Sequence, residues 1–279
     1  MLNWWYGIID FILPFQWASH AFMKNALTAV LLVTPLFGIL GTMIVNNRMA
    51  FFSDSLGHGA FTGIAIGSML GVIKPIWGAI IFSVAFAILI TTIKNKTKTS
   101  TDTIIGVFSS TTIAAGLVLI TLFNQPYNTY LVGDLLSITP SDIALLLIVF
   151  VLVVILWVTI FNKLLVISVN PLLASSRGIN TMLIDILFTS AVAVIVTITI
   201  QWVGILIINS LLVLPAAAAR NIASNTRQYH ALSIAAALIS GLAGLIASYY
   251  LNTATGATIV LIAALLYFIT LSIRGKVLK

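Results

Sequence analysis

Nine apolar runs of about 20 residues each follow one another along almost the whole chain, and each is long enough to cross a bilayer as a helix. They cover residues 22–45, 51–72, 75–94, 104–123, 142–162, 180–200, 203–222, 230–251 and 255–273. Only 7% of the 279 residues are charged and 61% are hydrophobic, against roughly 25% and 45–50% in soluble domains. The sequence therefore predicts an all-α, polytopic bundle of eight to nine membrane-spanning helices, with 75–94 and 203–222 the weakest of the nine.

No Pro/Gly/Ser-rich or charged stretch is long enough to be a linker, so we expect residues 1–279 to form a single transmembrane domain. Residues 1–20 contain four Trp and Tyr residues, which favours an N-terminal segment at the membrane interface. They lack the basic start and the cleavage site of a signal peptide. The chain has no cysteine, which excludes disulfides and thiolate metal ligands.

The basic residues gather on alternate loops. Eleven of the 13 follow the first, third, fifth and seventh runs or the last one: Arg48, Lys94, Lys96, Lys98, Lys163, Arg177, Arg220, Arg227, Arg274, Lys276 and Lys279. The opposite side has only Lys24 and Lys74. Because cytoplasmic loops collect Lys and Arg, this pattern predicts a cytoplasmic C-terminus and, with nine spans, an external N-terminus. The net charge of +7 thus indicates membrane topology and a lipid environment rather than nucleic-acid binding.

Small residues recur at every fourth position of the run 51–72: Ser55, Gly59, Gly63, Gly67 and Gly71. Small side chains at this spacing let helix backbones approach closely in lipid. The pattern therefore predicts tight helix packing, not a binding site.

Ionisable side chains inside a span indicate function, because burying one in a membrane costs at least ~2.5 kcal/mol. All six acidic residues are Asp, and four of them lie outside the spans or at helix starts: Asp10, Asp102, Asp134 and Asp142. Asp54, Asp185 and His58 remain. Asp185 lies in the first turns of the run 180–200, where the helix dipole explains an acid.

Asp54 and His58 are four residues apart, so both side chains lie on one helix face. A carboxylate and an imidazole suit Mn²⁺, Fe²⁺ or Zn²⁺. Two ligands form an incomplete shell, as a site that must release its ion requires, and Asn209, Ser210 or a second copy of the chain would complete it. Alternatively, Asp54 favours the positive helix N-terminus and His58 pairs with it. The spacing alone leaves both interpretations open.

Three catalytic motifs are absent from the sequence. It contains no P-loop, no H-E-x-x-H and no G-x-S-x-G. We therefore expect neither an intramembrane metalloprotease nor a hydrolase, and no enzyme activity on this chain. If ATP drives a transport reaction, another subunit hydrolyses it.

Four segments resemble the permeases of ABC importers for zinc, manganese and related metals. They are RMAFFSDSLGHGAFTGIAIG (48–67), STDTIIGVFSS (100–110), VNPLLASSRGIN (169–180) and VGILIINSLLVLPAAAAR (203–220). Their order and spacing extend the resemblance over roughly residues 20–275.

The resemblance implies a bacterial plasma (inner) membrane protein that pairs with a second copy of itself, two cytoplasmic ATP-binding subunits and an external metal-binding protein. Zn²⁺ or Mn²⁺ would be the transported substrate, with no permanently bound cofactor. By position, Asp54 and His58 fall on the family's metal-coordinating Asp and His. Segment 169–180 corresponds to the element that couples the permease to the ATPase, through Asn170, Pro171, Leu172, Leu173, Ala174, Arg177 and Gly178. Family members commonly have acids around this proline, which are missing here.

Three other interpretations stay open. In a secondary transporter, Asp54 or Asp185 would bind the coupling proton or sodium ion, and ATP dependence would separate it from an ABC importer. A non-transporting scaffold leaves Asp54 and His58 without a purpose. A permease for siderophores or cobalamin does not need such a pair. The sequence does not specify the metal.

Overall fold

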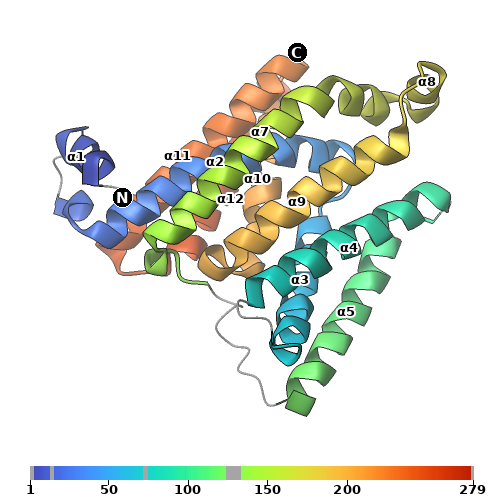
Figure 1. The fold of residues 1–279 in the computed structure, drawn as a ribbon. Helices are drawn as coiled ribbons and strands as arrows, with labels where there is room; N and C mark the ends of the chain where they lie inside the picture. The colour runs from blue at the N-terminus through green and yellow to red at the C-terminus, as the bar shows by residue number, and fades with distance from the viewer. Residues whose placement is uncertain (1–2, 13–15, 72–74, 98, 124–132, 278–279) are drawn as a thin grey trace. The chain divides into compact units, whose positions relative to one another are not determined.

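The computed structural model describes residues 3–12, 16–71, 75–97, 99–123 and 133–277, and all regular structure within them is helical (Figure 1). This confirms the all-α prediction. The helices are α1 (Asn3–Ile12), η1 (Gln16–Ser19), α2 (Ala21–Asn46), α3 (Phe52–Met69), α4 (Pro75–Lys96), α5 (Thr101–Phe123), η2 (Leu135–Ser137), α7 (Pro140–Val169), α8 (Pro171–Ser176), α9 (Thr181–Val203), α10 (Ile205–Ile222), α11 (Thr226–Leu251) and α12 (Thr255–Val277).

Seven of these helices are long and apolar enough to cross a membrane: α2, α4, α5, α7, α9, α11 and α12. The predicted span 75–94 is among them. Helix α3 has the length but includes Asp54, His58 and four glycines, which lower its mean hydropathy. The apolar part of α10, Ile207–Ile222, is only about 24 Å long at 1.5 Å per residue, against a hydrocarbon core of about 30 Å. The predicted number of spans, eight to nine, therefore still depends on α3 and α10.

The local sequence fixes several helix ends. At the start of α7, Thr139 Oγ1 donates to Asp142 Oδ2 at 2.7 Å, and the Thr139 backbone N–H donates to the same oxygen at 3.0 Å. Pro140 occupies the first helical position, where its missing N–H is not needed. Asn225 caps α11 by accepting from the Gln228 N–H at 2.9 Å. These caps satisfy backbone donors that would otherwise be left unpaired.

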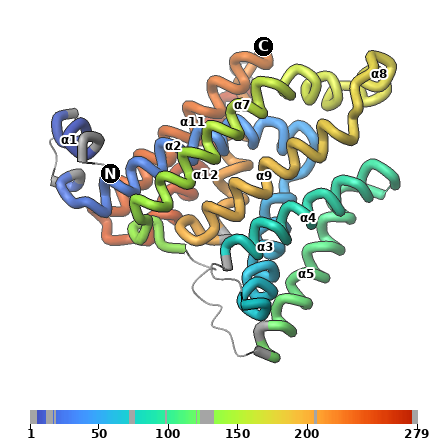
Figure 2. Tube along the Cα trace, viewed as in Figure 1, coloured from blue at the N-terminus to red at the C-terminus, as the bar shows by residue number. Residues whose placement is uncertain are grey.

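The described residues divide into two compact units. Unit 1 comprises residues 1–42, 133–151 and 202–279, and unit 2 comprises residues 43–132 and 152–201. Helices α10, α11 and α12 pack against one another within unit 1. Within unit 2, α3 packs against α4 and α5 (Figure 2).

The predicted close packing of the helix 51–72 is found between α3 and α4. A Cβ atom on Gly63 would lie 2.8 Å from Ala79 Cα and 2.7 Å from Phe82 Cβ. From the other side, a Cβ atom on Gly78 would lie 2.8 Å from Gly67 Cα. Ser55 is fully buried, and Gly59 faces the Phe86 ring.

Gly71 does not belong to this packing stripe, so its prediction was wrong. It lies beyond the end of α3, has φ +68°, and has no described residue within 4 Å of its Cβ position. Its backbone N–H donates to the Ser68 carbonyl at 3.3 Å. Gly71 therefore permits the left-handed backbone that follows the helix rather than a close helix contact.

We predict that Gly63→Leu destabilises the protein by about 1–3 kcal/mol or more, because the added side chain meets the α4 backbone, which cannot rotate away. Gly106→Leu is the matched control, since Gly106 on α5 is exposed and, in the described part of the chain, no atom lies within 4 Å of its Cβ position. Thermal unfolding in detergent checks this. Equal melting temperatures for the two variants would contradict the close α3–α4 contact.

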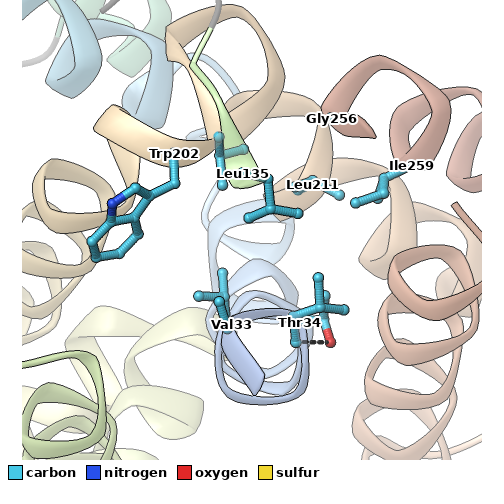
Figure 3. A pocket seen from close by; sticks show the side chains of 10 residues that line it. Val33, Thr34, Leu135, Trp202, Leu211, Gly256 and Ile259 are labelled. Carbon is cyan, nitrogen blue, oxygen red and sulfur yellow. Dashed lines mark hydrogen bonds between the residues drawn. The ribbon is translucent and has the colours of Figure 1, made fainter. Parts of the chain in front are cut away.

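In unit 1, α2 packs closely on α10 and α11. A Cβ atom on Gly38 would lie 2.8 Å from Ile234 Cα, and the Ser233 hydroxyl donates to the Gly38 carbonyl at 2.6 Å. Figure 3 shows a small pocket in this unit, of about 20 Å³, lined by Val33, Leu135, Leu211 and other apolar side chains. Its one hydroxyl, of Thr34, donates to the Val30 carbonyl. A space this small and apolar is a packing gap rather than a ligand site.

The N-terminal helix α1 is attached to α2 by polar contacts. Lys24 Nζ lies 2.7 Å from Asp10 Oδ2 and 5.6 Å from the centre of the Tyr6 ring. Tyr6 also donates to Asn25 Oδ1. Lys24 is 7% exposed, so this cation is buried and paired, although the sequence indicated only a loop charge. That residues 1–20 lie at the membrane interface stays a prediction.

Candidate metal-transport site

Asp54 and His58 meet on one face of α3, as their spacing predicted. The distance from His58 Nε2 to Asp54 Oδ2 is 3.7 Å, and the two side chains are 23% and 35% exposed. This distance is too long for a strong hydrogen bond. It does fit two ligands of one ion: with metal–ligand distances of about 2.0–2.2 Å, ligand atoms lie roughly 3.0–4.2 Å apart. The pair is therefore open enough, and spaced correctly, to hold a divalent cation.

The site offers a partial ligand set. Among the described residues, no group of three or more His, Asp or Glu side chains could hold a metal ion together. The remaining ligands would have to be neutral oxygens, water or groups from another chain. Such a shell binds an ion without the closed four-ligand cage of a structural zinc site, and so allows release.

The helix-dipole interpretation of Asp54 also has a structural basis. Asp54 lies in the first turn of α3, and the preceding N-cap residue, Phe51, provides no side-chain hydrogen bond. A carboxylate here faces the positive end of the helix. Both roles are compatible with one geometry, so a functional experiment must separate them.

Asn209 and Ser210 lie in the second turn of α10, which follows α9 after Gly204, a residue with φ +85°. Both are half-buried. They belong to unit 1, whereas Asp54 and His58 belong to unit 2. Their contribution to a metal pathway stays a prediction.

Asp185 has a different environment from the one expected. It lies in the second turn of α9, is only 5% exposed, and has two partners from the end of α4. Lys94 Nζ lies 3.6 Å from its Oδ2, and Asn95 Nδ2 donates to the same oxygen at 3.3 Å. A buried, paired carboxylate is a structural connection between α4 and α9. This placement weakens both the dipole interpretation and the use of Asp185 as an ion-coupling site.

Sequence reasoning missed Lys94 and Asn95 as partners of Asp185. It counted Lys94 only as a loop charge, because no spacing rule connects residues on helices so far apart in the chain. The sequence offered one indication: Asp185 lies within an apolar run, and a buried carboxylate needs a cation as its partner.

Helix α8 lies within the predicted coupling element 169–180 and is defined by its caps. Asn170 Oδ1 accepts from the backbone N–H groups of Leu172 and Leu173 at 3.0 and 3.2 Å. Pro171 is the first helical residue, and Gly178, with φ +73°, follows the C-cap residue of α8. Arg177 is the C-cap residue. Ala174 is fully buried, so this side of α8 packs against the rest of the protein.

The opposite side of α8 is apolar and exposed. Leu172 is 82% exposed and Leu173 is 44% exposed. These two leucines are available for contact with another protein, and the coupling role of the element 169–180 stays a prediction.

Arg48 lies just after the end of α2 and has an unusual backbone conformation. Its φ is +55°, and among the described residues only Asn252 is another non-glycine residue with positive φ. The Arg48 N–H donates to the Val45 carbonyl at 3.3 Å, and the Met49 N–H to the Ile44 carbonyl at 2.9 Å. This is a Schellman cap, in which glycine normally occupies the left-handed position. An arginine there costs about 1–2 kcal/mol relative to glycine.

The chain is similar to known membrane-transport proteins over most of its length. A family model described as the ABC 3 transport family matches residues 19–274. The manganese transport system membrane protein MntC of Listeria monocytogenes is 29% identical, with 92% of each chain covered. The high-affinity zinc uptake system membrane protein ZnuB of Haemophilus influenzae is 31% identical, covering 85% of this chain and 92% of that protein. The solved structure of PsaBC from Streptococcus pneumoniae in complex with Fab superposes with a TM-score of 0.79. The sequence identity is 29%, and the match covers 94% of this chain and 95% of the chain in that structure.

Proposed function

Because the chain belongs to the ABC 3 transport family, we propose that it is the membrane-spanning permease subunit of an ATP-driven importer for Mn²⁺ or Zn²⁺. The relatives above are named as manganese and zinc transport proteins, which supports this substrate class. Seven apolar helices fit a multi-pass protein of the bacterial inner membrane. The observation that carries the proposal is the Asp54–His58 pair, 3.7 Å apart on one face of α3.

In this proposal, two copies of the chain form the membrane part, and two separate ATP-binding subunits bind on the cytoplasmic side. An external metal-binding protein delivers the ion. Closure of the ATPases moves α8 and reorients the helices around a transient site at Asp54 and His58. The buried Asp185–Lys94 pair connects α9, which follows α8, to α4, which packs on α3. It offers one route by which a movement of α8 reaches the metal pair.

The topology in this proposal has nine spans, with the N-terminus outside and the C-terminus inside. In this topology α3 and α10 also cross the membrane, surrounded by other helices instead of lipid. They would need such surroundings because α3 contains the proposed metal pair and α10 is short. The excess of basic residues on alternate loops supports this orientation.

Metal uptake by proteoliposomes that contain the complete complex tests the proposed function. We expect uptake of Mn²⁺ or Zn²⁺ only when ATP is supplied on the ATPase side, and competition between the two ions identifies the preferred one. Proton or sodium gradients in the absence of ATP serve as the comparison. Gradient-driven uptake without ATP would contradict the proposal and favour a secondary transporter.

A further inference from the structure

A cavity of about 250 Å³ lies in unit 2, where α2, α4 and α7 end and α8 and α9 begin. This volume far exceeds the ~30 Å³ share of a single water molecule. Its charged lining residues are Arg48, Lys94 and Asp185. The amide side chains of Asn46, Asn47 and Asn95 add hydrogen-bond donors. We refer to it as the Arg48 cavity.

The charges of the lining favour an anion. Two cations and one carboxylate give a net charge of +1 (2 − 1). Asp185 is already matched by Lys94 at 3.6 Å and by the Asn95 amide. Arg48 forms no ion pair with any described residue, so its guanidinium is the unmatched charge of the cavity. A divalent cation would need free carboxylates, and the single one present is occupied.

The backbone at Arg48 supplies a second, independent observation. The Schellman cap at the end of α2 holds this residue in the left-handed region, where glycine would be more stable. The cap is completed by Met49, which is buried, and not by the arginine side chain. The strained position therefore places a guanidinium at the cavity without helping the turn itself. Strained residues of this kind cluster at functional sites, which supports a role for the Arg48 side chain.

From these observations, we propose that the Arg48 cavity binds the phosphate group of an anionic membrane phospholipid. Helices α2, α4, α7 and α9 are all long enough to span a bilayer, which supports placing their shared ends near the lipid headgroups. Arginine and amide donors suit phosphate oxygens. The site is separate from the metal pair and does not depend on the metal proposal.

The surface of α4 also suits a lipid. Ile81 and Ile88 are 70% and 37% exposed. They are seven residues apart, and Asn95 lies seven residues after Ile88. Seven residues are nearly two helical turns, so the three positions share one face of α4. Acyl chains along this face would have their headgroup next to Asn95, at the cavity. Basic pockets at the ends of transmembrane helices bind lipid headgroups in the same manner.

Native mass spectrometry of the purified full-length chain tests the proposal. The delipidated protein is titrated with phosphatidylglycerol, with zwitterionic phosphatidylcholine, and with inorganic phosphate as competitor. We expect preferential binding of phosphatidylglycerol, and a roughly five- to tenfold loss of that affinity in Arg48→Gly, because one cation near a membrane surface contributes about that much. Glycine suits the left-handed backbone, so this variant keeps the fold. Arg227→Gln removes an exposed cation on α11 and should leave the affinity unchanged.

Each alternative outcome identifies another explanation. Unchanged phosphatidylglycerol binding in Arg48→Gly would overturn the proposal. Displacement of the lipid by millimolar inorganic phosphate would assign the cavity to a small soluble anion instead. If Arg48→Gly weakened retention of the ATP-binding subunit while lipid binding stayed intact, Arg48 would belong to a protein interface.

Discussion

His58→Ala and Asp54→Ala should each reduce ATP-driven uptake of Mn²⁺ or Zn²⁺ by at least ~10-fold, while complex assembly and basal ATPase activity persist. Each variant removes one of the two ionisable side chains of α3, which are the proposed ligands of the ion. Loss of residues that merely support a metal ligand typically costs 10–100-fold, so loss of a ligand itself should cost no less. Neither change creates a packing defect, because both side chains are partly exposed and Ala is a good helix former. Uptake by proteoliposomes containing each variant complex measures the effect.

Asp102→Ala provides the matched control. Asp102 lies in the first turn of α5, as Asp54 does in α3, and both helices belong to unit 2. If Asp54 served only the helix dipole, the two variants would each lose about 0.3–1 kcal/mol of stability and retain uptake equally. A difference confined to uptake assigns the ion to Asp54. Normal uptake in both His58→Ala and Asp54→Ala would move the search to Asn209 and Ser210.

The helices were predictable because apolar run length and helix caps are local properties of a sequence. The expected run 142–162 appears as α7, Pro140–Val169, which begins at the cap formed by Thr139, Pro140 and Asp142. The helix continues past Lys163 because nothing in the sequence stops it before Asn170, which caps α8 instead. Lys163 therefore marks the end of the expected membrane span, whereas the helix itself continues to Val169.

The candidate site was predictable only in part. The i,i+4 spacing brought Asp54 and His58 together, because a helix fixes that geometry. The partners of Asp185 come from another helix, and the conformation of Arg48 depends on how α2 ends. Gly71 matched the spacing of the packing stripe but lies past the end of α3, so a periodic pattern cannot show where its helix stops.

Leu172→Asp should abolish transport by a different route, through loss of the ATP-binding subunit. Leu172 is 82% exposed on a capped helix, so it contributes little to folding of this chain but would be buried by a partner. Burying a leucine contributes about 1.5–3 kcal/mol, and placing a carboxylate there adds a desolvation cost. At about 1.4 kcal/mol per tenfold, retention of the ATP-binding subunit should fall by at least ~10-fold.

Leu172→Met distinguishes lost apolar contact from damage to α8, because methionine keeps the volume and apolar character of leucine. We expect it to retain the ATP-binding subunit and uptake, and we expect both variants to unfold at the wild-type temperature. Co-purification, uptake and thermal unfolding together measure this. If Leu172→Asp retained the subunit and transported normally, the exposed leucines would not be the docking surface, and the element 169–180 would lose its assigned role. If Leu172→Asp abolishes transport while Asp54 and His58 are unchanged, ion binding and ATP coupling depend on separate parts of the chain, α3 and α8.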